Sequence, residues 1–343
     1  MAKASIASPK NWHIPKISPL AGLILGILIL FTCLVYSVTL GAAAIPFSKV
    51  LASFITFDGS YEHLVIQTVR LPRSLFAVVV GAALAVAGAL MQGLTRNPLA
   101  DPGILGIESG AALAVVVTIF IFGSSSLSMF TVVAFLGAGT TAMLVYLLGS
   151  LGRGGATPLN LTIAGAAITA LISSFITAIL ILSQRTLDEI RFWLAGSLAG
   201  RDFNILFSTL PFVVIGLILA FALGRQITTM SLGDEVAKGL GQQTAWVKIL
   251  TAISVVLLAG SSVSLAGPIG FIGLVVPHMV RFFIKADYRW ILPYSAVVGA
   301  TLLLVADVAA RILLKPQELP VGVMTALIGS PFFVYLAKSK VKK

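Results

Sequence analysis

Charged residues are scarce in this chain of 343 residues: Asp, Glu, Lys and Arg make up 10%, against about 25% in soluble globular proteins. Hydrophobic residues make up 58%, and the mean hydropathy is +1.05. This composition excludes a soluble fold. Because one crossing of a bilayer needs about 20 apolar residues, the length allows roughly eight to ten spans and little extramembrane chain.

Cysteine and histidine are also scarce. Cys33 is the only cysteine and lies in an apolar run, which excludes a disulfide framework and a thiolate metal cluster. His13, His63 and His278 are too far apart for a local zinc motif, and neither HExxH nor the phosphate-binding GxxxxGK[ST] motif occurs. We therefore expect no metal, no cofactor and no ATP hydrolysis on this chain.

The net charge of +11 does not indicate nucleic-acid binding, because the basic residues lie singly and at the two ends rather than in one stripe. Membrane orientation explains them better. Residues 1–19 are basic without an acid, and the apolar run Leu20 to Leu40 that follows is too long for a signal peptide. This run is expected to be a retained first span.

The sequence predicts an all-α, polytopic membrane protein with about ten spans. A single transmembrane domain would cover residues 20–337, between a cytoplasmic segment 1–19 and a basic cytoplasmic tail 338–343. Basic residues favour the side that holds both termini, which the positive-inside rule makes cytoplasmic. The expected spans are 20–40, 71–93, 105–122, 128–148, 159–183, 203–223, 245–263, 270–284, 291–310 and 321–337.

The second expected span contains GAALAVAGAL, residues Gly81 to Leu90. Side chains this small allow helix backbones to approach closely in lipid. We interpret the segment as a packing surface rather than a substrate contact.

A polar segment, SLGDEVAKGLGQQ, separates the sixth and seventh expected spans. Leu232, Val236 and Leu240 would form one apolar stripe on a helix of about ten residues. Ser231 is expected to cap this helix and Gly241 to end it. The stripe could rest on lipid headgroups or on the protein itself, or it could be a knob inserted into a cytoplasmic partner.

Five motifs together resemble the iron-siderophore and vitamin B12 ABC importer permeases of the FecCD type. The resemblance covers nearly the whole chain, in the order that this family shows. The motifs are RLPR from Arg70, NPLADPGILGIESGA from Asn97, LGDEVAKGLG from Leu232, GPIGFIGLVVPHMVR from Gly267 and ELPVGVMTALIGSPFF from Glu318.

The resemblance implies a permease of the bacterial cytoplasmic membrane that performs no chemistry. It would pair with itself or with a sister permease around a central pathway. ABC ATPase subunits would bind on the cytoplasmic side, and a separate substrate-binding protein, lipid-anchored or periplasmic, on the outer side. The implied cargo is a ferric siderophore, with vitamin B12 or haem as alternatives.

The resemblance also implies functional residues. The cytoplasmic loop 225–244 would couple to the ATPase through Leu232, Gly233, Asp234, Glu235, Ala237, Leu240 and Gly241. Arg70, Arg73 and Arg311 would dock the binding protein, since a guanidinium can hold a carboxylate with two hydrogen bonds. Anchoring to lipid phosphates is the alternative role for these arginines.

In similar permeases the fifth span lines the pathway. The polar residues here are Thr157, Asn160, Thr162, Thr169, Ser173 and Ser174. We interpret them as pathway candidates, although hydrogen bonding between helices would also account for each hydroxyl.

Glu108 and Asp307 are acids in or near apolar segments, and such residues are functional candidates by default. They support a rival hypothesis, a proton-coupled secondary carrier that works alone. Asp307 precedes Arg311 by four residues, however, so an ion pair on one helix is the simpler account. A membrane scaffold or receptor without transport is a third hypothesis, which leaves the loop around Asp234 unexplained.

Overall fold

The computed structural model describes residues 18–41, 45–123, 126–151, 157–314 and 317–341, and within these ranges every regular element is a helix. Seven helices are long and apolar enough to cross a membrane. They are α1 (Pro19–Thr39), α4 (Leu71–Thr95), α6 (Leu127–Ser150), α7 (Pro158–Leu182), α9 (Phe203–Ala222), α12 (Thr244–Ala266) and α14 (Tyr288–Ile312).

Three shorter apolar segments complete the set: α5 (Ile107–Phe122), α13 (Ile272–Phe283) and the part Val321–Val334 of α15 (Val321–Val341). Each expected span coincides with one of these helices, so the predicted polytopic helical fold is confirmed. Most of the predicted segment 1–19 and the last two residues of the predicted tail lie outside the described residues.

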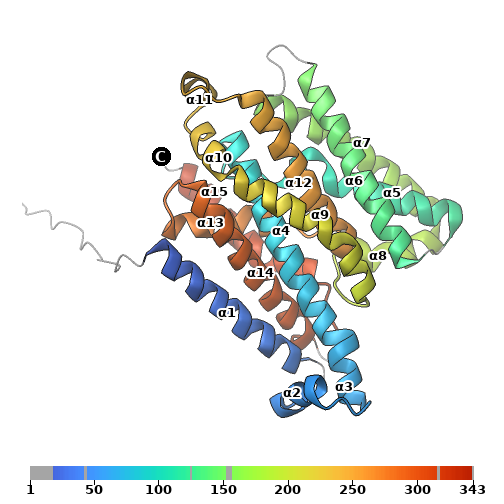
Figure 1. Ribbon diagram of the computed structural model, residues 1–343. Coiled ribbons are helices and arrows are strands. Elements are labelled where there is room, and N and C mark those ends of the chain that lie inside the picture. Colours follow the sequence, from blue (N-terminus) through green and yellow to red (C-terminus); the bar gives the residue numbers. More distant parts are fainter. Residues whose placement is uncertain (1–17, 42–44, 124–125, 152–156, 315–316, 342–343) are drawn as a thin grey trace, which may run out of the picture.

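The bundle is built around α4, which packs against α14, α12 and α13 (Figure 1). Helix α1 lies at one edge of the bundle against α14, while α5, α6 and α7 form a group at the opposite edge. The spans therefore differ in burial. Most of α4 is buried, whereas most of α1 and of α7 is exposed on the surface of the single chain.

Small residues of α4 set its distance from two neighbouring helices. A Cβ atom at Gly81 would lie 2.4 Å from the carbonyl oxygen of Gly299 in α14, and one at Gly88 would lie 2.0 Å from that of Gly273 in α13. Only glycine, which has no Cβ atom, allows the helix backbones to approach this closely. The predicted role of this segment in packing is confirmed.

Several short elements were not predicted. α2 (Phe47–Ile55), α3 (Tyr61–Val65) and the π-helical turn η1 (Ile66–Arg70) lie before α4, and the 3₁₀ turn η2 (Pro102–Leu105) before α5. α8 (Gln184–Leu194) follows α7, and α10 (Gly224–Met230) follows α9. The short helix predicted between the sixth and seventh spans is present as α11 (Asp234–Gly239), between α10 and α12, with different bounds. Figure 1 shows α2 and α3 at the end of the bundle opposite α11.

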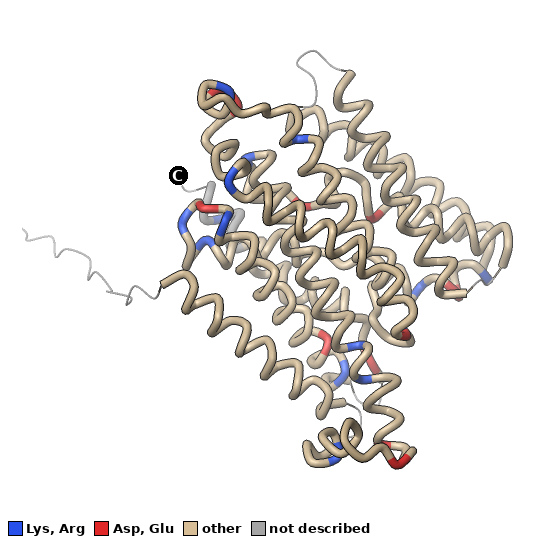
Figure 2. Tube along the Cα trace, in the orientation of Figure 1, with Lys and Arg blue, Asp and Glu red and all other residues tan. Residues whose placement is uncertain are grey.

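Charged residues gather towards the two ends of the bundle, with few between them (Figure 2). One group surrounds α10, α11 and the turn before α14, and we call this the α11 end. The other lies at the start of α4 and the end of α14, and we call this the opposite end. The apolar middle matches what a bilayer requires.

Candidate functional site

The loop at the α11 end turns sharply at glycines. Gly233 has φ +125° and immediately precedes α11, and Gly241 has φ +79° shortly after it. Both values suit glycine, which lacks a Cβ. The expected helix of about ten residues capped by Ser231 is wrong: α11 spans six residues, and Ser231 lies at the end of α10, where its hydroxyl donates to the carbonyl of Thr228.

α11 and the residues that flank it present an apolar surface that the described part of the chain leaves exposed. Leu232, Val236 and Leu240 are 67%, 47% and 70% exposed, whereas Ala237 is fully buried against the bundle. The flanking charges and turns of this loop place it outside the apolar middle of the bundle. Exposed leucines there mark a surface that a partner can cover.

The two acids of α11 have different surroundings. Lys248 of α12 donates to the Oδ2 atom of Asp234 at 2.5 Å, which ties the helix to a span. The Glu235 side chain is 89% exposed and contacts Lys238 at 3.2 Å. Asp234 therefore positions α11, while Glu235 is available to a partner.

The three arginines predicted to dock a binding protein lie together at the opposite end, where they are bonded within the chain. Arg73 contacts the Oδ1 atom of Asp307 at 2.9 Å and Glu318 at 2.5 Å. Arg311 contacts the Oδ2 atom of Asp307 at 3.1 Å, which confirms the ion pair predicted along the helix, and also bonds to the hydroxyl of Ser37.

Arg70 ties the start of α4 to the end of α1. Its Nη1 atom donates to the carbonyl oxygens of Val38 and Thr39 at the end of α1. Arg70, Arg73 and Arg311 are all less than a tenth exposed. We call Arg70, Arg73, Asp307, Arg311 and Glu318 the arginine cluster; Glu318 is its most exposed member, at 37% of the side chain.

The acids proposed for proton transfer do not form one path in the described structure. Asp307 is fully buried between Arg73 and Arg311 and forms an ion pair with each of them. Glu108 lies in the first turn of α5, on a different helix from Asp307. A relay from one acid to the other has no visible intermediate groups in this part of the chain.

The pathway candidates on α7 fall into two groups. Thr162, Ser173 and Ser174 are exposed on the free surface of the helix. Thr157 instead caps the helix by accepting from the backbone N–H of Asn160, and Thr169 meets Ser109 of α5 at 3.4 Å. The exposed group lies on a surface that a second subunit could cover.

Comparison with known proteins decides the family. The model described as the FecCD transport family matches residues 27–339. The chain belongs to the FecCD transport family. It is 49% identical to the probable siderophore transport system permease protein YfiZ of Bacillus subtilis, over 92% of this chain and 95% of that protein.

A second relative of this FecCD permease is the Fe(3+)-citrate import system permease protein YfmD of Bacillus subtilis, 44% identical over 92% of this chain and 93% of that protein. A solved inward-facing structure of a metal-chelate type ABC transporter superposes with a TM-score of 0.82 at 31% identity, covering 92% of this chain and 98% of the solved one. These matches confirm a non-catalytic, multi-pass transport subunit.

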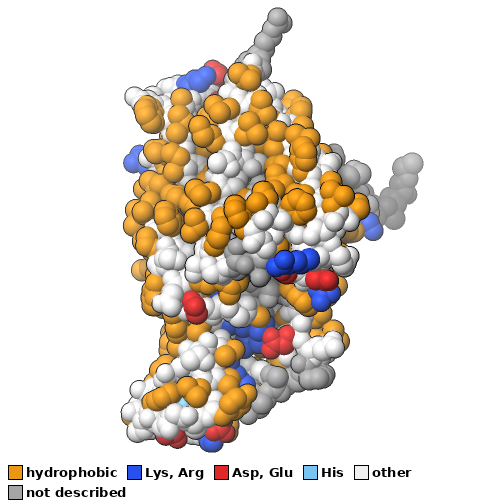
Figure 3. Space-filling view, turned by 90° about the vertical axis from the view of Figure 1, so that its right-hand side faces the viewer, with side chains coloured by type: hydrophobic (Ala, Val, Ile, Leu, Met, Phe, Trp, Pro, Cys, Tyr) orange, Lys and Arg blue, Asp and Glu red, His pale blue; other side chains and the backbone are white. Residues whose placement is uncertain are grey.

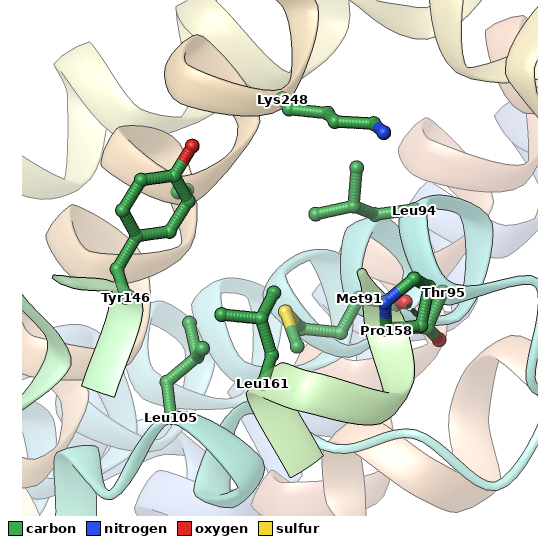
Figure 4. A pocket seen from close by; sticks show the side chains of 9 residues that line it. Met91, Leu94, Thr95, Leu105, Tyr146, Pro158, Leu161 and Lys248 are labelled. Atoms are coloured by element: carbon green, nitrogen blue, oxygen red, sulfur yellow. Dashed lines mark hydrogen bonds between the residues drawn. The ribbon is translucent and has the colours of Figure 1, made fainter. Parts of the chain in front are cut away.

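The ion pair of α11 lies beside the start of α7 in this FecCD permease. Figure 4 shows Lys248 extending over a small cavity whose walls come from α4, α6, η2 and α7. Leu94 of α4 and Tyr146 of α6 line it, together with Pro158 and Leu161 of α7. A displacement of α11 would therefore reach the start of the candidate pathway helix through one lysine side chain.

Sequence reasoning missed a polar network that joins α10 of this FecCD permease to three spans. Arg281 of α13 donates to Gln92 of α4 at 2.5 Å and to the hydroxyl of Tyr288 at 2.9 Å. The Tyr288 backbone N–H donates to Thr228 of α10, and Gln92 donates to the carbonyl of Gly273. These residues are far apart in sequence, so no local pattern could reveal the network.

Proposed function

We propose that this FecCD permease is the membrane-spanning subunit of an ATP-driven importer that carries a ferric siderophore across the bacterial cytoplasmic membrane. The observation that carries the proposal is α11, an exposed apolar knob tied to the bundle by the Asp234–Lys248 ion pair. The cargo follows from relatives named for siderophore and Fe(3+)-citrate transport.

In this proposal α11 enters a cleft of a separate ATPase. Leu232, Val236 and Leu240 would be covered there, with Glu235 at the rim. Closure of the ATPase dimer would then displace α11 as a rigid body and rock α12 through Lys248. Alternating access would follow from the movement of α12 and of the spans held by the Arg281 network.

The α11 end would be cytoplasmic, together with both termini. The arginine cluster would then face the outside and dock the substrate-binding protein. Because Arg73 is already bonded to Glu318, a carboxylate of that protein would reach Arg73 by replacing Glu318, the more exposed partner. Such an exchange keeps the guanidinium satisfied in both states.

A second permease subunit, identical or a sister chain, would cover the exposed side of α7. Only Leu161, Gly165 and Ile172 of this helix are buried in the single chain. Thr162, Ser173 and Ser174 would then line a mildly polar pathway between the two subunits. Such a lining suits passage of a large chelate without tight binding.

Two experiments test the proposal. A cysteine at Lys238, in a chain whose Cys33 is replaced by serine, should resist an impermeant maleimide in intact cells and react after permeabilisation. Affinity isolation from membranes should recover an ATPase and a binding protein. Labelling of the cysteine at position 238 in intact cells would contradict the proposed orientation. Uptake of vitamin B12 or haem, instead of ferric chelates, would contradict the proposed cargo.

A further inference from the structure

A cavity of about 310 Å³ lies at the opposite end, between the start of α4, α8 and the segment before α15. Its lining includes the charged residues Arg73, Glu189, Arg201 and Glu318 and the indole of Trp193. Figure 3 shows the face that carries α5 to α8, where charged side chains of both signs gather below a region dominated by hydrophobic side chains. The cavity is distinct from the exposed side of α7.

Arg201 is the charged residue of this cavity that lacks an ion-pair partner. It is only 6% exposed, and its Nε and Nη1 atoms have no hydrogen-bond partner among the described residues. Burial lowers the pKa of Arg201 to about 10, without a neighbouring acid to oppose the effect. The side chain is still a cation at neutral pH, so the fold keeps a buried charge without its counterion, which is unfavourable.

Neither of the two carboxylates that line the cavity forms an ion pair with Arg201. Glu189 meets Arg185 one helical turn away at 3.1 Å, and Glu318 meets Arg73 at 2.5 Å. Each acid is matched by another arginine, which leaves the Arg201 guanidinium without a carboxylate partner among the described residues. One carboxylate would neutralise the charge of Arg201, whereas a doubly charged phosphate would overcompensate it.

Trp193 supplies a second free donor on the wall of the same cavity. It is 7% exposed, and its indole Nε1 atom also lacks a hydrogen-bond partner among the residues described. Indole nitrogens are donors only, and buried ones usually have a partner. An acceptor group that enters here can meet both an indole N–H and a planar guanidinium, which together favour a carboxylate.

We propose that this cavity is a carboxylate-binding site, in which Arg201 and Trp193 receive a carboxylate arm of the iron chelate before it enters the pathway. The choice of the chelate as the source rests on the proposed function. It is supported by continuity, because α8 contributes Trp193 and Glu189 and follows directly on α7, the candidate pathway helix. The site gives the permease a means to select carboxylate-bearing chelates.

The test uses the complete transporter in lipid nanodiscs, with radioactive ferric citrate as the carboxylate probe and ferrichrome, a hydroxamate chelate without free carboxylates, as the comparison. Equilibrium binding is measured without the binding protein. Arg201→Gln should weaken ferric citrate binding about tenfold or more, since it removes a charge-assisted pair. Arg201→Lys should restore part of it, and ferrichrome binding should not change.

Arg191→Gln is the matched control, because that side chain is 59% exposed, lies on the same helix as Trp193 and pairs with Asp188, which does not line the cavity. It should leave ferric citrate binding unchanged. Arg201→Gln should also leave the thermal unfolding temperature unchanged or raised, since it removes a buried charge that has no partner in the chain. A merely structural arginine would lower that temperature on substitution.

Equal ferric citrate binding by the wild type and Arg201→Gln would overturn the inference. So would a variant that binds the chelate normally but loses affinity for the binding protein, since the carboxylate would then belong to that protein. ATPase activity stimulated by the binding protein, measured in the same nanodiscs, reports on the proposed function separately. It can persist when the carboxylate site fails.

Discussion

Lys248 of α12 and Asp234 of α11 form a hydrogen-bonded ion pair of 2.5 Å, which joins the exposed loop helix to a membrane span. The lysine also lies over the cavity at the start of α7 (Figure 4). One side chain thus contacts the surface proposed for the ATPase and the entry of the proposed pathway.

Breaking this pair should uncouple transport from ATP hydrolysis. The Asp234 and Lys248 side chains are 30% and 23% exposed, so Asp234→Asn should cost no more than about 1 kcal/mol of stability. Uptake of ferric chelate should nevertheless fall several-fold while basal ATPase activity persists. The swap Asp234→Lys with Lys248→Asp should restore part of the uptake, and full uptake by Asp234→Asn alone would contradict the role of the pair.

The apolar surface of α11 should determine ATPase binding. Leu240 is 70% exposed, so Leu240→Asp should not destabilise the isolated permease, because no buried contact is lost. It should reduce recovery of the ATPase in affinity isolation, since a charge would enter an apolar cleft. Lys238→Gln, on the same short helix, is the control and should retain the ATPase; equal recovery with Leu240→Asp would show that this surface is not the interface.

Asp307 should be essential for stability. Replacement by Asn leaves the guanidinium groups of Arg73 and Arg311 with a neutral neighbour, which should cost about 3–5 kcal/mol. Thermal unfolding in detergent measures the loss. Asp188→Asn, which removes an exposed partner of Arg191 at 3.6 Å, should change the unfolding temperature little. An undiminished unfolding temperature for Asp307→Asn would contradict the structural role of the cluster.

Gly88 should not tolerate even alanine. An added Cβ would lie 2.0 Å from the carbonyl oxygen of Gly273, so α4 and α13 would have to separate, at a cost of about 1–3 kcal/mol. Gly139→Ala on α6 is the control, because its nearest neighbour would be a Val256 methyl group at 3.9 Å. If the unfolding curves of the two variants coincided, the close approach of α4 to α13 would not be required for stability.

The spans could be predicted from the sequence because each is a long apolar run, which needs no knowledge of its neighbours. α8 was missed because its composition is polar, although the pairs Arg185–Glu189 and Asp188–Arg191 have helical spacing. Ser231 was assigned to the wrong helix, because the turn at Gly233 separates it from α11. The sequence contains both signals: the helical spacing of the charged pairs predicts α8, and the glycine at position 233 predicts a turn before α11.

Contacts between residues that are far apart in the sequence could not be predicted from its pattern. The pair Asp307–Arg311 follows from helical spacing, but the contact of Asp307 with Arg73 joins α14 to α4. The lack of a partner for Arg201 is likewise a property of the folded chain, since it depends on which arginines Glu189 and Glu318 contact. Only tertiary packing determines these relationships.

The most direct test of the account is uptake of ferric siderophore into proteoliposomes that hold the permease with its co-purified ATPase. Uptake should require ATP on the side of α11 and the binding protein on the opposite side, and it should be lost with Leu240→Asp. Uptake by the permease alone, driven by a proton gradient without ATPase or ATP, would contradict the account.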